Sequence, residues 1–94
     1  MKMQKVRIVW EEKVIEHIRK HGVRKSEVEN SLNGKTYTKA VTRNGEKRTA
    51  VLAESEGRVL FIVLQRVREN IFIVLSAYEA PEKMKKLYNR KAKK

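Results

Sequence analysis

The 94-residue sequence has no cysteine, which excludes a disulfide framework and chemistry based on a thiolate. It has no aspartate either, so all eleven acidic residues are glutamate. The two histidines, His17 and His21, stand four positions apart, a spacing that binds zinc on some helices. The sequence offers neither a third ligand nor an HExxH pattern beside them. We therefore interpret both as helix-surface residues and expect no metal site and no cofactor.

Long hydrophobic runs are also missing. No apolar run approaches the roughly 18 residues that a membrane-spanning helix needs. The charged N-terminus, Met1 to Lys5, leads into an apolar segment that is too short for a signal peptide. We therefore expect a cytoplasmic protein that does not associate with membranes.

Positive charge dominates what is present. Lysine and arginine number 23 against 11 glutamates, which makes the formal net charge +12. The segment from Pro81 to Lys94 alone contains seven basic residues and one glutamate, and so carries half of this net charge. Such a balance favours binding to nucleic acid or to an acidic protein partner.

The most apolar stretch runs from Gly57 to Ala77. Two runs of β-branched and aromatic residues, 57–65 and 71–77, are separated by a polar break at 66–70, which predicts two antiparallel strands joined by a hairpin. Neither run alternates apolar with polar residues, so both faces of these strands should need cover. We expect them at the centre of the sheet of a single domain that spans residues 1–94.

Shorter signals predict the other elements. Val6 to Trp10 predicts a first strand. Glu11-Glu12 opens a helix that Gly22 ends, and Ser26 with Glu29 fits a capping box for a second helix. Strands are predicted at 35–43 and 46–55, joined by the hairpin signal Asn44-Gly45. Pro81 suits the N1 position of a last helix, and residues 91–94 form a basic tail that we expect to be frayed.

These elements predict an α+β fold of order β-α-α-β-β-β-β-α. An antiparallel sheet of four to five strands carries an N-terminal helical hairpin and a C-terminal helix. Because two central strands that are apolar on both faces exceed what three short helices cover, a homodimer or another protein partner is plausible.

Short motifs occur in a specific order along this chain. They are Trp10-Glu11, Lys20-His21-Gly22-Val23, Glu27-Val28, the run from Gly57 to Val63, the run from Ile73 to Ala77, and Lys86-Leu87-Tyr88. In this order and spacing, from about Val9 to Tyr88, the chain resembles the BrnT family of type II toxin–antitoxin toxins, which are compact relatives of the RelE-type ribonuclease toxins.

The resemblance implies a RelE-like fold and a metal-independent endoribonuclease that arrests translation. It also implies a cognate antitoxin, usually a DNA-binding protein, and hence a toxin–antitoxin hetero-oligomer. The chain departs from the family at one motif. Family members tend to carry Ser-Ala-Arg at the end of the last strand, whereas this chain has Ser76-Ala77-Tyr78. A basic residue that would contact the scissile phosphate is therefore missing at Tyr78.

Metal-free cleavage of RNA needs a base, an acid and cations beside the phosphate. We expect Arg58 and Arg48 to supply cations, and Tyr78 and Glu79 to supply acid–base groups, whereas neither histidine is expected near the sheet. Structural roles remain open for these positions: Arg58 as a solvated charge at a strand end, Tyr78 packed on the last helix, and Glu79 at the start of that helix.

Other basic residues are expected to follow the phosphate backbone of bound RNA. They are Lys39, Arg43, Lys47, Arg66, Arg68, Lys83, Lys86 and Arg90, with Lys47 on the face opposite to Arg48. Two alternatives to the ribonuclease remain open. One is an RNA- or DNA-binding domain without catalysis, and the other is an interaction module whose basic helix binds an acidic partner.

Overall fold

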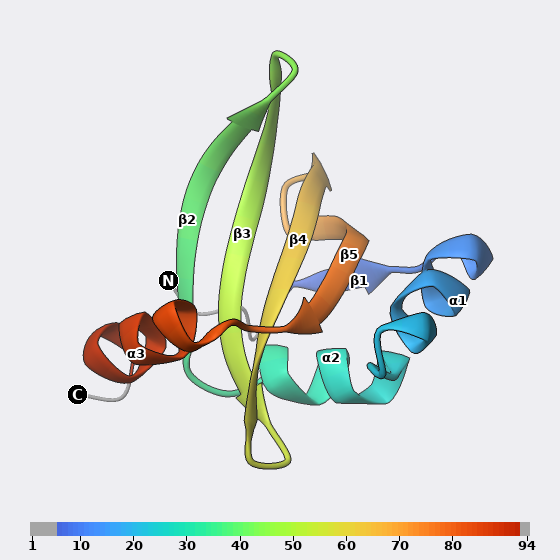
Figure 1. Ribbon diagram of the computed structural model, residues 1–94. Helices are drawn as coiled ribbons and strands as arrows, with labels where there is room; N and C mark the ends of the chain where they lie inside the picture. The colour runs from blue at the N-terminus through green and yellow to red at the C-terminus, as the bar shows by residue number, and fades with distance from the viewer. Residues whose placement is uncertain (1–5, 93–94) are drawn as a thin grey trace.

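The computed structural model describes residues 6–92 of the chain. Its elements follow the order β1 (Arg7–Val9), α1 (Glu12–Lys20), α2 (Lys25–Leu32), β2 (Thr36–Arg43), β3 (Glu46–Ser55), β4 (Arg58–Arg68), β5 (Ile71–Glu79) and α3 (Glu82–Lys91). The strands form one five-stranded sheet of order β1-β5-β4-β3-β2 (Figure 1). The predicted α+β class and the order of elements are therefore confirmed, and β4 and β5 lie inside the sheet as expected.

Tight turns connect β2 to β3 and β3 to β4. Asn44 and Gly45 both have positive φ, of 53° and 79°, as do Glu56 and Gly57, with 52° and 80°. Such backbone angles match the right-handed twist of a hairpin and suit asparagine and glycine. The Asn44-Gly45 prediction is thus confirmed.

The polar segment after the central apolar run is part of the strand. The sequence predicted a polar break at residues 66–70, but β4 continues to Arg68. Arg66 still pairs with Phe72 of β5, with a register irregularity between Arg66 and Arg68. Backbone pairing therefore continues although the side chains from Arg66 to Arg68 are exposed.

The prediction of an antiparallel sheet is wrong for β1. This strand pairs in parallel with β5, placing Arg7 opposite Ile71 and Val9 opposite Ile73, so the sheet is mixed. The chain leaves β1 through α1 and α2 and re-enters the sheet at the opposite edge in β2. A local apolar pattern shows that a strand exists, but the direction of a neighbour some sixty positions away depends on the completed fold.

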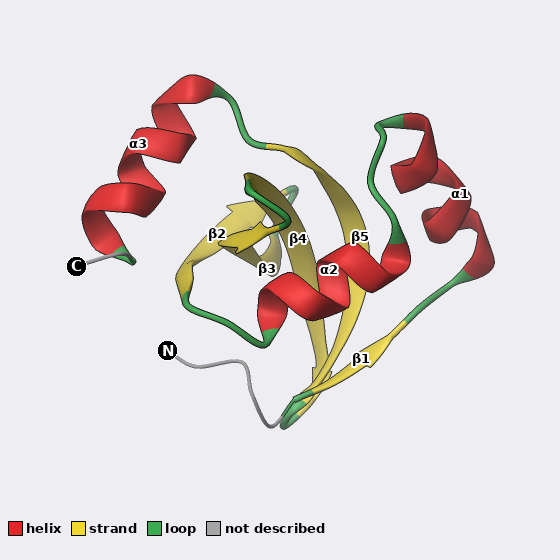
Figure 2. Ribbon diagram, turned by 90° about the horizontal axis from the view of Figure 1, so that it is seen from below, coloured by secondary structure: helices red, strands yellow, loops and turns green. Residues whose placement is uncertain are grey.

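The main core lies between the α1–α2 pair and one face of the sheet (Figure 2). Val14 and Ile18 of α1 and Val28 and Leu32 of α2 are buried, as the predicted stripes required. On the sheet side they meet buried residues of β3, β4 and β5, among them Val51, Leu60, Ile62 and Val74. Val6, Ile8 and Trp10 pack at the margin of this core.

The start of α2 differs from the prediction. The helix begins at Lys25 with Arg24 as its N-cap, not at Ser26. Glu27 is the N3 residue, and its carboxylate accepts a hydrogen bond from the Arg24 backbone N–H at 3.5 Å. The predicted N3 residue, Glu29, instead accepts a hydrogen bond from the Trp10 indole at 3.1 Å. Another glutamate two positions earlier thus takes the capping role.

Among the described residues, only α3 covers the second face of the sheet, and it covers one end. There α3 packs on Leu52 and Val59 through buried Tyr88, with Met84 and Leu87 beside it. Pro81, predicted at N1, is the N-cap, and Lys91 is the last residue of the helix. Lys93 and Lys94 of the predicted tail lie outside the described residues. Along the rest of this face, the apolar side chains of Phe61, Val63 and Leu75 stay half-buried.

Candidate functional site

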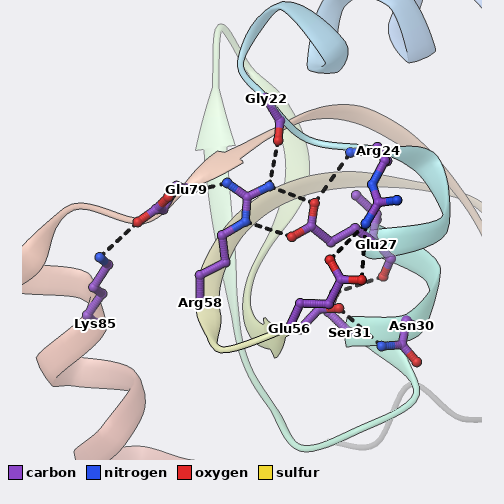
Figure 3. A network of polar contacts seen from close by, with 11 residues as sticks. Gly22, Arg24, Glu27, Asn30, Ser31, Glu56, Arg58, Glu79 and Lys85 are labelled. Atoms are coloured by element: carbon purple, nitrogen blue, oxygen red, sulfur yellow. Dashed lines mark hydrogen bonds and ion pairs between the residues drawn. The ribbon is translucent and has the colours of Figure 1, made fainter.

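Two regions bring the predicted functional residues together. The first, which we name the Arg58 corner, consists of Gly22, Arg24, Glu27, Glu56, Arg58, Glu79 and Lys85 (Figure 3). The second, the open-face groove, lies on the half-covered face of the sheet and is described below.

Arg58 opens β4 and holds the corner together. Its Nε and Nη2 donate to both carboxylate oxygens of Glu27, each at 2.6 Å. Nη2 also donates to the backbone carbonyl of Gly22, and Nη1 donates to Oε1 of Glu79 at 3.3 Å (Figure 3). One guanidinium therefore ties the end of α1, the start of α2 and the end of β5 to β4.

The charges of the corner compensate one another. Hydrogen bonding from Arg58 holds the pKa of the buried Glu27 carboxyl below its usual range, and the same bond raises the pKa of Arg58. Lys85 donates to Glu79 at 3.0 Å, and Lys85 first and Arg58 second lower the pKa of Glu79. A carboxylate held ionised in this way is a weak proton acceptor. Of the predicted catalytic residues, Arg58 and Glu79 thus lie in an ion-pair network.

Motifs that are far apart in the sequence converge at this corner. Gly22, Glu27 and Arg58 belong to three of the segments that carry the resemblance, and each contacts another through Arg58. Their pairing joins the α1–α2 connection to the start of β4.

His21 lies beside the sheet, where no histidine was expected. It is the C-cap of α1, and its ring centroid is 6.4 Å from that of Tyr78 and 4.9 Å from that of His17. The ring of Tyr78 also packs on Phe61 of β4, at 5.2 Å. Sequence reasoning missed this pair because a helix end and a strand end more than fifty positions apart share no local pattern. Glu79 ends β5 and does not start α3, which begins at Glu82.

The open-face groove has an apolar floor and a basic wall. Its volume is about 390 Å³, and Val41, Ala50, Phe61, Val63, Leu75 and Ser76 line it together with Thr42, Arg43 and Arg48. Val41, Ala50 and Phe61 also line a second hollow of about 250 Å³, which reaches Lys39 and the α3 residues Met84 and Leu87. The groove therefore runs along the sheet from the end of β2 to α3.

Arg48 is incompletely satisfied in this groove. Its Nη2 donates to the exposed carboxylate of Glu46 at 3.0 Å. Its Nε is buried and has no acceptor among the described residues. An unsatisfied buried donor costs about 1–3 kcal/mol, and a charged group costs more. A ligand that brings an acceptor into the groove would remove this cost.

The remaining predicted cations divide between surfaces. Lys39 and Arg43 share the face of Arg48, whereas Lys47 and Arg66 fall on the opposite face by strand alternation. Arg66 lies over the ring of Phe72, 5.7 Å from its centroid. Arg68 is exposed at the end of β4, and Lys83, Lys86 and Arg90 are exposed on the outer side of α3. The groove and the outer side of α3 therefore each gather several of these cations, whereas Lys47 and Arg66 lie on the opposite face of the sheet.

Comparison with protein-family models, curated proteins and solved structures finds no match to this chain. Within residues 6–92, no three histidine or glutamate side chains lie close enough together to hold a metal ion. No helix in the same range is long and apolar enough to cross a membrane.

Proposed function

We propose that this protein is a cytoplasmic ribonuclease toxin of a type II toxin–antitoxin system, with a RelE-like fold and a cognate antitoxin that neutralises it. It binds RNA along the open-face groove and cleaves it without a metal ion. The observation that carries the proposal is Arg48, whose buried Nε has no acceptor among the described residues and which stands beside the apolar floor of the groove.

The chemistry of the groove suits single-stranded RNA. Unpaired bases have apolar faces that pack on aromatic and aliphatic side chains, and here Phe61, Val63 and Leu75 supply such a floor. Phosphate oxygens accept hydrogen bonds from guanidinium groups, and Arg43 and Arg48 stand at the wall. The net charge of +12 attracts a polyanion from a distance.

A second candidate is an RNA- or DNA-binding domain that uses the same groove without catalysis. The Arg58 corner favours it, because two of the four predicted catalytic residues are bound to structural partners there. Tyr78 favours it too, since it replaces the arginine of the family motif.

The first experiment adds the purified protein to a translating cell extract and maps new 5′ ends of the RNA. Free RNA with a chelator is tested in parallel, and binding to a fluorescent single-stranded RNA is measured over a salt series. Arg48→Gln is compared with Arg7→Gln, which removes the same charge from exposed β1, away from the groove.

New ends that form in chelator, disappear with Arg48→Gln and persist with Arg7→Gln would support the ribonuclease. Intact RNA together with salt-dependent binding that Arg48→Gln weakens would establish the second candidate. Binding that Arg48→Gln and Arg7→Gln weaken equally would refute a role for the groove in either candidate.

A further inference from the structure

We propose that His21 and Tyr78 are the catalytic acid–base pair of this protein, and that the phosphodiester to be cleaved lies against both rings at the end of β5. This inference rests on the proposed ribonuclease function. It replaces Arg58 and Glu79, two of the acid–base and cation candidates from the sequence, with a pair that the fold alone brings together.

The Arg58 corner holds both residues in place. Arg58 donates to the carbonyl of Gly22, the residue after His21, and to the carboxylate of Glu79, the residue after Tyr78. One guanidinium therefore sets the distance between the two chain segments that carry the rings. In this arrangement the ion pair with Glu27 supplies the rigidity that a preorganised site requires.

The pair is open to substrate. Within residues 6–92, β1 pairs only with Ile71, Phe72 and Ile73, so no described strand lies on the outer side of the second half of β5, and α1 packs beside it. His21 is exposed, and Tyr78 is half-buried. Ring centroids 6.4 Å apart allow both polar groups to approach one phosphodiester within hydrogen-bonding distance.

The groove leads to the pair. Phe61 forms part of its floor and packs on Tyr78 at 5.2 Å. Phe61 of β4 pairs with Tyr78 of β5 on one side and with Leu52 of β3 on the other. Arg48 lies four residues before Leu52 on β3. Standard strand dimensions put the backbones of Arg48 and Tyr78 about 16 Å apart. A strand of RNA held by Arg48 would therefore pass Phe61 before it reaches Tyr78 and His21.

The two groups suit the two proton transfers of RNA cleavage. The unprotonated nitrogen of the His21 imidazole accepts the proton of the ribose 2′-hydroxyl, and the 2′-oxygen forms a bond to phosphorus. The bond from phosphorus to the 5′-oxygen breaks, and the phenol of Tyr78 gives its proton to that oxygen. The products are a 2′,3′-cyclic phosphate and a 5′-hydroxyl. The proton on His21 then returns to the Tyr78 oxygen through solvent, which restores both groups.

The test measures cleavage of a short single-stranded RNA by His21→Asn and Tyr78→Phe. Removing a general acid or base typically costs 10²–10⁴-fold in rate, so we expect each variant to lose about 100-fold or more. The melting temperature should stay at the wild-type value, since neither side chain belongs to the buried core. His17→Asn is the matched control, because His17 touches His21 but has no ring contact with Tyr78 among the described residues.

A modified substrate separates the two roles. RNA with sulfur in place of the scissile 5′-oxygen has a leaving group that needs no proton. We expect Tyr78→Phe to cleave this RNA at nearly the wild-type rate and His21→Asn to remain slow. A purely structural role for either residue would give no such selective rescue.

The outcomes distinguish this inference from the proposed function. Wild-type cleavage that both variants retain within about threefold would overturn the pair and leave the ribonuclease intact. Wild-type protein that binds RNA and leaves it whole would overturn the pair together with the ribonuclease, and would leave the binding domain. Loss of cleavage in both variants with rescue of Tyr78→Phe alone would support the pair.

Discussion

The Arg58 corner and the open-face groove each contain one partly buried arginine, and they use it in opposite ways. The side chains of Arg58 and Arg48 are equally exposed, at 27%. Arg58 makes four hydrogen bonds to two glutamates and a carbonyl. Arg48 makes one to an exposed glutamate, and no described residue offers an acceptor to its Nε.

This difference separates support from binding. Removing one member of a network whose charges are all compensated lowers the stability of the fold, because the remaining partners lose their counter-charge. A buried donor without an acceptor destabilises the free protein and gains energy when an acceptor arrives. The exposed fraction of the side chain does not distinguish the two arginines, whereas their hydrogen-bond partners do.

The largest effect is expected from breaking the corner. Arg58→Ala leaves the buried Glu27 carboxylate without its partner, and removing one member of a buried ion pair typically costs about 3–5 kcal/mol of unfolding free energy. Urea denaturation followed by circular dichroism measures it. Arg24→Ala is the control, because its pair with Glu56 is exposed and should contribute less than about 1 kcal/mol. Equal losses in both variants would contradict the distinction.

The stability should also depend on pH through Glu27. Because folding lowers the pKa of this carboxyl from its ordinary 4.5, the stabilisation is complete above that value. It is lost as pH falls from about 4.5 through the lowered folded-state pKa. The difference in unfolding free energy between wild type and Glu27→Gln should therefore shrink on acidification over that range. A difference that stays constant down to the acid transition would show that Glu27 is not the titrating group.

Removing the groove arginine should have the opposite effect on stability. Arg48→Met eliminates the unsatisfied Nε and keeps an apolar stem, so the unfolding free energy should rise by about 1 kcal/mol. Affinity for single-stranded RNA should fall about tenfold, as expected for the loss of one charge-assisted contact worth about 1.4 kcal/mol. Arg7→Met should change neither quantity appreciably. A variant that is both less stable and binds RNA normally would make Arg48 a structural residue.

The smallest effect concerns the outer side of α3. Replacing Lys83, Lys86 and Arg90 with glutamine removes three exposed charges that no described residue pairs. If they follow the RNA backbone, the slope of log affinity against log salt should decrease by about 2, at about 0.7 per phosphate contact. Folding should not change. An unaltered slope would leave the groove as the sole binding surface among the predicted residues.

Much of the fold could be predicted because its signals are local. Asn44-Gly45 specifies a tight hairpin, and the buried Val14, Ile18, Val28 and Leu32 follow from helical periodicity. The candidate site could be predicted only in part. Arg48, Lys39 and Arg43 do share a face, because alternation along paired strands follows from sequence positions. The partners of Arg58 could not be predicted, since Gly22 and Glu27 reach it only through tertiary packing.

The amino-acid sequence by itself determined the order of the strands and helices, the central position of β4 and β5, and the strong positive charge. These properties depend on residue type and on periods of two to four residues. The tertiary structure alone decided that β1 runs parallel to β5, that Glu27 neutralises Arg58, and that His21 lies beside Tyr78. Each of these contacts joins segments that are far apart in the sequence and meet only because whole elements pack together. No local sequence pattern encodes such a contact.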